Sequence, residues 1–404
     1  MDRQGSVLSR THAPAAAIAG IAETPPRRDP GDATPLSLIS TVARDAMIDA
    51  ALTPADVDGL LLAPTFAGAP LTIASMVADV LGLRPSYCDL VDLGGATAAG
   101  MVWRAAAAIA TGACRSVLCV LAEAPNRSRR GPERPSTGPP SWPALPMAQW
   151  DRPFGPMGVN SGYALAAARH AHLYGTTDAQ RAKVAVDQRT NACAHPDAIF
   201  HGRPITVDDV LASPLVSDPL RLLEIVMPCV GATAFVVTTP DVARQAPHPS
   251  AMLRGFGEQV THSSLSSLPD ITRTGIVESA GRAFTGAGVT PDDIDLVSVY
   301  DCYTITVLLT LEDAGFCPKG QGGPFVADHD LTFGGDLPTN THGGQLSYGQ
   351  AGLAGGASHV TEAVVQLRGD AGARQVADCR LAFVNGNGGV LAEQCSLVLE
   401  RVDG

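Results

Sequence analysis

Short apolar runs alternate with longer helical patterns along most of this chain. The runs that predict buried strands lie at 15–22, 59–63, 88–93, 116–122, 232–238, 296–299 and 380–384. The patterns that predict helices between them lie at 35–51, 96–111, 275–284 and 353–367. Strands of this kind, alternating with long helices, are typical of sheets that are covered on both faces. We therefore predict an α/β protein.

A short turn motif occurs twice. Thr53-Pro54 and Thr290-Pro291 each stand just before a predicted strand, 237 positions apart (290 − 53). A glycine pair that is followed by a helix and an apolar strand also occurs in both parts, at 94–95 and at 343–344. Two correspondences in the same order indicate a duplicated α/β unit.

A long polar segment separates the two copies. Residues 124–160 are dense in Pro, Gly, Ser and Arg, which is typical of a lid or binding loop, with a flexible linker as the alternative. Helical patterns follow it, and the whole of 124–225 reads as an insertion. We predict a first half at 14–245, with 124–225 as an inserted loop domain, and a second half at 246–404.

The charge of the chain excludes one class of function. The formal net charge is -12 at pH 7, so no basic face is available to displace counterions from nucleic acid. Arg127, Arg129 and Arg130 form the densest basic cluster. This cluster predicts either a contact to a phosphate-bearing ligand or a set of solvated arginines.

Cysteine usage and hydropathy bear on metals and on location. The nine cysteines are spread singly, without a Cys-x-x-Cys pair, which argues against a zinc or redox motif. No run approaches the roughly 18–20 apolar residues that cross a bilayer, and we see no signal peptide. We expect a cytoplasmic protein without a metal.

Candidate chemistry gathers in one glycine-rich segment, 340–352. It contains Tyr348 and several amides, and the helical pattern 353–367 follows it. A glycine-rich turn that opens a helix presents free backbone N–H groups and a positive dipole end to an anion or carbonyl. Polar segments at 299–303 and 385–389 follow apolar runs, and we expect all three loops to form one pocket.

The order and spacing of four segments, 205–213, 228–234, 299–303 and 343–355, resemble the thiolase superfamily. The resemblance is to its lipid-transfer-protein branch, similar to the thiolase domain of sterol carrier proteins. It implies a thiolase fold: two duplicated βαβαβαββ halves in a layered αβαβα arrangement, with an inserted loop domain.

The thiolase nucleophile is missing. In the family a cysteine stands at a strand-to-helix turn, and the matching position here is Gly95. The family's histidine falls on Gln350, its second cysteine falls near Asn385, and a further His or Asn falls on Tyr300. Without a thiolate at Gly95 no acyl-enzyme can form.

Tyrosines lie on the loops that lack the catalytic residues of a thiolase. Three of the six tyrosines, Tyr300, Tyr303 and Tyr348, lie on the two reacting loops. This pattern resembles the thiolase-like aldolases of steroid and bile-acid side-chain degradation. It implies retro-aldol cleavage of a branched 3-hydroxyacyl-CoA with Tyr348 and Tyr300 as acid and base in either order, and Tyr303 as packing. A phenol of pKa near ~10 serves as a base only if neighbouring cations, dipoles or hydrogen bonds shift it.

The same resemblance implies which residues position the substrate and which bind its coenzyme A part. The oxyanion or substrate-positioning candidates are Gly95, His342, Gly344, Gln350, Asn385, Asn387 and Gly388. Asp301 is expected to hold a loop amide. Coenzyme A enters as part of the substrate, with no separate cofactor, and Arg127, Arg129 and Arg130 are the candidates to bind it.

Partners and alternatives follow from the same resemblance. It implies a homodimer formed through the strand near 86–93 and a small OB-fold, zinc-ribbon partner that completes a heterotetramer. Two other hypotheses stay open: a non-catalytic acyl-CoA-binding or scaffold subunit, and a hydratase-like or condensing enzyme.

Overall fold

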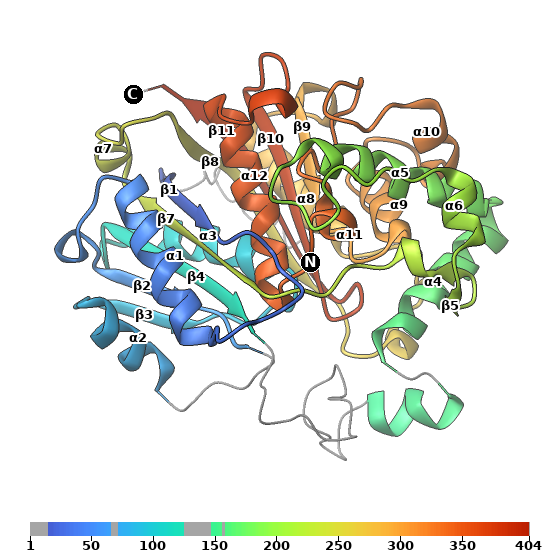
Figure 1. Ribbon diagram of the computed structural model, residues 1–404, viewed down its shortest axis with the longest axis horizontal. Helices are drawn as coiled ribbons and strands as arrows, with labels where there is room; N and C mark the ends of the chain where they lie inside the picture. Colours follow the sequence, from blue (N-terminus) through green and yellow to red (C-terminus); the bar gives the residue numbers. More distant parts are fainter. Residues whose placement is uncertain (1–14, 66–71, 125–146, 156–157, 404) are drawn as a thin grey trace, which may run out of the picture.

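One mixed sheet of nine strands runs through the computed structural model, which describes residues 15–65, 72–124, 147–155 and 158–403 (Figure 1). The strand order is β3-β2-β4-β7-β1-β8-β11-β10-β9. The two halves of the sheet join where β1 pairs with β8, through Ala17 with Met252 and Ile18 with Ala251.

Most elements of the first half were expected from apolar runs and helical patterns, but the helix at 73–81 was not. The elements of this half are β1 (Ala17–Glu23), α1 (Pro35–Asp49), β2 (Gly59–Leu62), α2 (Ile73–Leu81), β3 (Tyr87–Leu90), α3 (Thr97–Ala110), β4 (Ser116–Glu123) and β7 (Gly231–Thr238). Between β4 and β7 lie α4 (Val159–Tyr174), α5 (Asp178–Ala194), α6 (Val207–Ala212) and a hairpin of β5 (Leu215–Ser217) and β6 (Leu220–Arg221). Thr177 and Thr206 begin α5 and α6 with reciprocal capping hydrogen bonds.

The second half repeats the pattern with more helix. It consists of α7 (Pro240–Ala243), β8 (Ser250–Val260), α8 (Ile276–Ala287), β9 (Leu296–Val299), α9 (Thr304–Asp313), α10 (Gly322–Asp328), α11 (Gly344–Ser347), α12 (Ala357–Arg368), β10 (Leu381–Gly388) and β11 (Glu393–Val402). The expected helix at 353–367 begins only at Ala357, because a tight turn occupies Gly352–Gly356. Gly356 permits this turn to pack closely, since a Cβ there would lie 2.4 Å from the Gly95 carbonyl oxygen.

The predicted duplication is visible in individual hydrogen bonds. The backbone N–H of Thr53 donates to Asp56 and that of Thr290 donates to Asp293, both at 2.8 Å. Two residues farther on, Asp58 accepts the N–H groups of Arg115 and Ser116, and Asp295 accepts those of Arg380 and Leu381. In each half the turn therefore ties one strand to the beginning of its parallel neighbour, β2 to β4 and β9 to β10.

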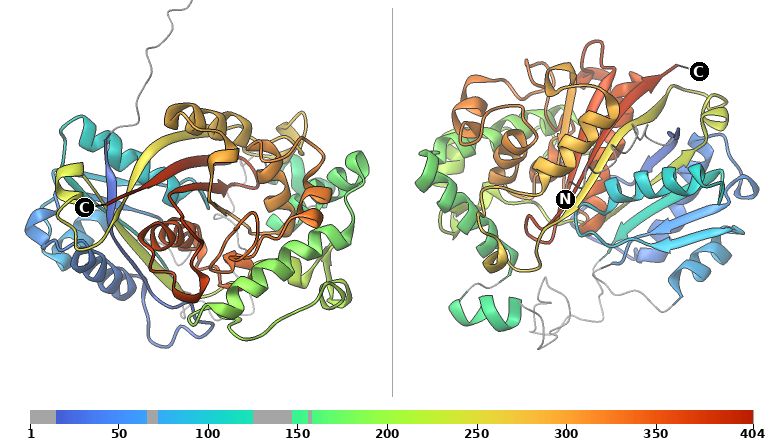
Figure 2. Two further views of the ribbon diagram at one scale, coloured as in Figure 1. Left: turned by 90° about the horizontal axis from the view of Figure 1, so that it is seen from above. Right: turned by 180° about the vertical axis from the view of Figure 1, so that it is seen from behind.

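The three largest hydrophobic clusters lie between the layers of the molecule. α1 and α2 cover the outer face of the first-half strands, and α8 and α9 cover the outer face of the second-half strands (Figure 2). α3 and α12 lie between the two parts of the sheet. The expected αβαβα layering is confirmed.

No helix in the described part of the chain is both long and apolar enough to cross a bilayer.

Candidate active site

Tyr300 occupies the space that a side chain at position 95 would need. It follows β9, and its backbone N–H donates to the Asn385 carbonyl at 2.9 Å. A Cβ built on Gly95, at the turn before α3, would lie 2.2 Å from Tyr300 Cζ and 2.4 Å from the Asn387 carbonyl oxygen. Real Cβ atoms do not approach so closely, so the phenol ring and a side chain at position 95 exclude each other.

Gln350 holds the Tyr300 hydroxyl. Its Nε2 donates to the phenol oxygen at 2.9 Å, which leaves the phenol O–H available as a donor. The backbone of Gln350 is fixed on both sides, since its N–H donates to Met227 and its carbonyl accepts from Cys229, each at 2.8 Å. Tyr300 is 6% exposed, and this burial raises its pKa above the ordinary value. Tyr300 is therefore a neutral phenol at pH 7.

A further tyrosine joins this cluster from the inserted region. Tyr163 on α4 stacks on Tyr303 with 4.3 Å between ring centroids, and its hydroxyl accepts from Asn387 Nδ2 at 3.2 Å. Tyr303 itself donates to Asn160, which supports its expected packing role. Our sequence reasoning missed Tyr163. The available signal was its helical spacing with the buried Ala166, Ala167 and His170.

The glycine-rich turn does not present free N–H groups as expected. Asp301 accepts the backbone N–H groups of Gln345 at 2.7 Å and Leu346 at 3.1 Å, at the start of α11. Gly344 makes room for this carboxylate, because a Cβ there would lie 2.1 Å from Asp301 Oδ2. The expectation that these N–H groups face a substrate is wrong, and the expected loop-holding role of Asp301 is confirmed.

Tyr348 lies on the other side of α11. It packs against Ala192 and Ala198 of the inserted region, and its ring centroid is 4.9 Å from that of His195. Burial raises its pKa well above the ordinary value, and the nearby Glu23 raises it further. A phenol that acts as a base needs neighbours that lower its pKa, but at Tyr300 and Tyr348 burial dominates and raises the pKa.

Two histidines separate the two phenols. Among the described residues, no hydrogen bond or ring contact joins Tyr300 to Tyr348. The four rings form a row instead. The centroids of Tyr300 and His359 are 6.1 Å apart, those of His359 and His342 are 5.1 Å apart, and those of His342 and Tyr348 are 5.3 Å apart. The catalytic loops therefore meet, but the phenols lie at opposite ends of this row of rings.

His342 and Gln345 carry unused polar atoms inside this row. His342 is 2% exposed and neither ring nitrogen has a partner within the described part of the chain. Burial lowers its pKa well below the ordinary value, and the neighbouring His359 and His195 lower it further, so the ring is neutral. Gln345 Oε1 is likewise buried without a partner. A neutral imidazole offers one donor and one acceptor, which suits a bound substrate oxygen.

The asparagines on β10 are engaged within the protein. Asn385 Oδ1 accepts from Ser396 Oγ at 2.8 Å, and Asn387 Oδ1 accepts from Gln394 Nε2 at 2.8 Å. Gly388 lets the strand pass Leu93, since a Cβ there would lie 2.1 Å from the Leu93 carbonyl oxygen. These side chains hold the β10–β11 hairpin together because alternate residues of paired strands face each other.

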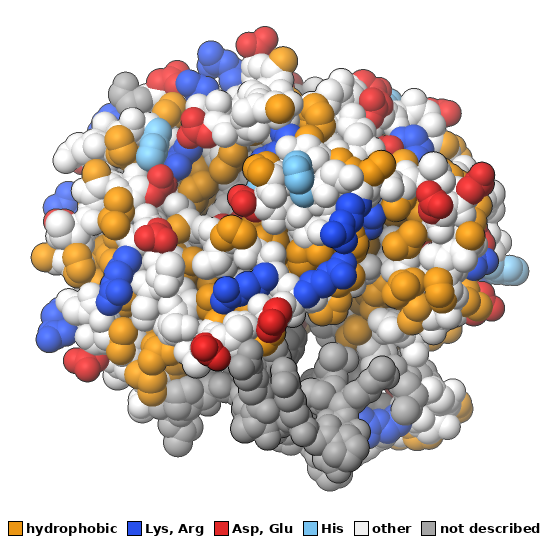
Figure 3. Space-filling model, in the orientation of Figure 1, with side chains coloured by type: hydrophobic (Ala, Val, Ile, Leu, Met, Phe, Trp, Pro, Cys, Tyr) orange, Lys and Arg blue, Asp and Glu red, His pale blue; other side chains and the backbone are white. Residues whose placement is uncertain are grey.

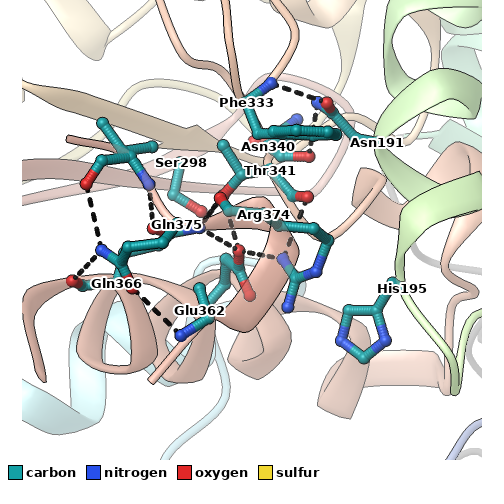
Figure 4. A network of polar contacts seen from close by, with 12 residues as sticks. Asn191, His195, Ser298, Phe333, Asn340, Thr341, Glu362, Gln366, Arg374 and Gln375 are labelled. Carbon is teal, nitrogen blue, oxygen red and sulfur yellow. Dashed lines mark hydrogen bonds and ion pairs between the residues drawn. The ribbon is translucent and has the colours of Figure 1, made fainter. Parts of the chain in front are cut away.

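A buried polar network holds the start of the glycine-rich segment (Figure 4). Thr341 donates to Glu362 at 2.5 Å, while Arg374 pairs with the same carboxylate and donates to the Thr341 carbonyl at 3.0 Å. Asn340 bonds both backbone groups of Val299, at 2.7 and 2.9 Å. The segments that carry Tyr300 and Tyr348 are thereby fixed to each other.

The remaining candidates are the arginine cluster, the cysteine next to the site and a metal site. Arg127, Arg129 and Arg130 lie outside the described residues. Burial raises the pKa of Cys302 to about 12, so this thiol, the nearest in sequence to Tyr300, is protonated at pH 7. No group of three His, Cys, Asp or Glu side chains arranged to hold a metal is found in the part of the chain that the structure describes.

Known proteins share this architecture. A family model described as thiolase C-terminal domain-like matches residues 257–401. A steroid side-chain-cleaving aldolase of Thermomonospora curvata is 34% identical over 88% of this chain and 90% of its own. An acetyl-CoA acetyltransferase of Methanothermobacter thermautotrophicus is 33% identical over 87% of this chain and 91% of its own.

A solved structure gives the same result in three dimensions. The Ltp2-ChsH2(DUF35) aldolase superimposes with a TM-score of 0.85 and 32% sequence identity. The match covers 96% of this chain and 98% of the other.

The contact at position 95 can be tested by stability. Gly95→Ala should cost about 1–3 kcal/mol of unfolding free energy, because the new methyl group overlaps the Tyr300 ring. Gly281→Ala on α8 is the matched control, since a Cβ there meets nothing within 4 Å. Urea denaturation measures both. Equal stability of the two variants would contradict the contact.

Glu23 should make stability depend on pH. Burial raises its pKa from 4.5 to about 8, although hydrogen bonds from Thr361 and Tyr348 oppose the shift. Between these two values the folded state holds a proton that the unfolded state has released, so stability falls as pH rises. Glu23→Gln should remove this fall.

Thermal melts of Glu23→Gln and the wild type across this pH range give the comparison. The exposed Glu278 supplies the control variant Glu278→Gln, which should follow the wild type. Parallel curves for the wild type and Glu23→Gln would show that Glu23 keeps an ordinary pKa.

Proposed function

Because this chain belongs to the thiolase superfamily, in the branch that holds steroid side-chain-cleaving aldolases, we propose that it is a carbon–carbon lyase that cleaves a branched 3-hydroxyacyl-CoA by a retro-aldol reaction. The observation that carries the proposal is the contact of Tyr300 with Gly95. A phenol fills the place where a thiolase has its nucleophile, so the chemistry proceeds without an acyl-enzyme.

The reaction needs three groups from the protein. A base takes the proton of the C3 hydroxyl while the C2–C3 bond breaks. The electron pair of that bond moves to the thioester as an enolate, which a hydrogen-bond donor stabilises. An acid then protonates C2, and the products are a ketone or aldehyde and a shortened acyl-CoA. No redox partner and no metal enters this balance.

Tyr348 is the proposed base, with Glu23 as the group that receives its proton. A neutral phenol accepts the substrate proton readily only if it passes on its own. Because the pKa of Glu23 is raised to about 8, the relay operates in the fraction of molecules in which Glu23 is ionised, where the phenol passes its proton to that carboxylate as it takes the proton of the C3 hydroxyl. This relay replaces the phenolate that the sequence led us to expect. It is consistent with the raised pKa of Tyr348.

Tyr300 is the proposed acid. Its hydroxyl accepts from Gln350 and keeps its own proton for donation to C2. The neutral ring of His342, whose nitrogens have no hydrogen-bond partner among the described residues, is the proposed donor to the thioester oxygen. The C3 hydroxyl oxygen and C2 are bonded to the same carbon, so the assignment requires the hydroxyls of Tyr348 and Tyr300 to reach C3 of the substrate from two sides.

Thiolase-type acyl transfer is the competing activity, and the acetyltransferase relative is what favours it. Gly95 carries no thiol, and burial raises the pKa of Cys302 to about 12. The chain therefore lacks the activated cysteine that such a transfer requires.

The proposal includes partners. The name of the Ltp2-ChsH2(DUF35) aldolase joins two proteins, which supports a complex of this chain with a DUF35-type protein. A cytoplasmic location remains part of the proposal. β3 is the edge strand of the sheet, and Leu90 on it is 47% exposed. An exposed edge strand is suited to pairing with a second copy, which supports a homodimer.

Replacing each phenol with phenylalanine tests the assigned chemistry. Tyr300→Phe and Tyr348→Phe should each lower kcat for a 3-hydroxyacyl-CoA by about 10²–10⁴-fold, the usual contribution of a positioned acid or base. Tyr174→Phe, at the end of α4, is the matched control. Product formation by the protein with its partner provides the measurement, and full activity of both variants would refute the roles.

A further inference from the structure

Arg189 on α5 is a buried cation without a counter-charge. It is 4% exposed, its Nε donates to Ser347 Oγ at 2.9 Å, and its Nη1 donates to the Arg203 carbonyl at 3.1 Å. Within the described part of the chain no Asp or Glu forms an ion pair with it. Burying a charge is costly unless an opposite charge compensates it.

The other buried arginines show the usual arrangement. Arg181 pairs with Glu224, Arg368 pairs with Asp49, and Arg374 pairs with Glu362. Arg189 differs from these three because its contacts are a hydroxyl and a carbonyl. The positive charge of Arg189 is therefore not neutralised by a described carboxylate.

More positive charge gathers at the same place. The Arg189 guanidinium carbon lies 3.9 Å from the centroid of the Phe200 ring, and that of Arg28 lies 5.2 Å from it. Burial, together with the charges of Arg203 and Arg28, lowers the pKa of Arg189 to about 10. Arg28 and Arg203 are exposed.

The surface shows the same concentration. Lys and Arg side chains lie close together near the middle of the face in Figure 3. Like charges repel, so three neighbouring arginines that form no ion pair with a described Asp or Glu are suited to binding an anion.

We propose that Arg28 and Arg189, which lie over the Phe200 ring, and the nearby Arg203 form a binding site for the phosphate groups of the acyl-CoA substrate. Guanidinium groups bind phosphate through paired N–H donors, and several together match its multiple negative charges. This inference rests on the proposed function for the identity of the ligand. The site is distinct from the cluster at Arg127, Arg129 and Arg130.

The site is joined to the catalytic segment. Arg189 bonds Ser347, the residue before Tyr348, and the N–H of Ile199 donates to the Tyr348 carbonyl at 3.0 Å. Phe200 follows Ile199 directly. A phosphate bound at Phe200 therefore lies beside the backbone that positions Tyr348.

Calorimetric binding of adenosine 3′,5′-bisphosphate, the phosphate-bearing part of coenzyme A, tests the site itself. Arg28→Ala and Arg203→Ala should each weaken binding about tenfold, and together about a hundredfold. Both side chains are exposed, so the variants fold. Arg44→Ala, exposed on α1, is the control. Absence of binding to the wild type, or equal binding by all variants, overturns the site.

Steady-state kinetics on the full complex then tests the ligand. The KM for the 3-hydroxyacyl-CoA should rise about tenfold more in Arg28→Ala and Arg203→Ala than the KM for the matching acyl-pantetheine, which lacks these phosphates. Equal rises overturn the assignment to the substrate carrier and leave a site for a separate phosphate. If the wild type cleaves neither thioester while bisphosphate binding still requires Arg28 and Arg203, the proposed function fails and the anion site stands.

Discussion

The contact between the Tyr300 ring and the backbone of Gly95 fixes the arrangement of the whole site. It brings together the end of β9, the turn before α3 and the Asn387 carbonyl of β10. The ring fits because position 95 has no Cβ, and Gly356 and Gly386 allow neighbouring backbone to approach the same turn. The aldol chemistry that we propose depends on this exchange of a thiol-bearing residue for a phenol.

Burial is the second constraint, and it determines which protonation states the site can use. It raises the pKa of Tyr300 and Tyr348 and lowers that of His342, so all three side chains are neutral at pH 7. In a neutral site, a group that accepts a proton has to pass its own proton to a second group, and Glu23 beside Tyr348 is that second group. The charged pair of Glu362 and Arg374 holds the start of the catalytic loop through Thr341.

The sequence predicted the layers, the duplicated halves and the Gly95, Gln350 and Tyr300 cluster, because strand patterns and the thiolase resemblance are properties of local segments. It did not predict Tyr163 or Glu23. Tyr163 meets Asn387 across 224 positions, and Glu23 meets Thr361 across 338, so no local pattern links them. It also assigned free N–H groups to the turn at Gly344, because the carboxylate of Asp301 that takes them belongs to another loop.

The central claim is that carbon–carbon cleavage proceeds here without a covalent intermediate on the protein. Intact-mass spectrometry of the enzyme, quenched during turnover of a 3-hydroxyacyl-CoA, tests it most directly. The account predicts the unmodified mass of the chain at every time point while ketone or aldehyde and shortened acyl-CoA accumulate. A mass increase equal to one acyl group, appearing with turnover and lost when substrate is exhausted, would contradict it.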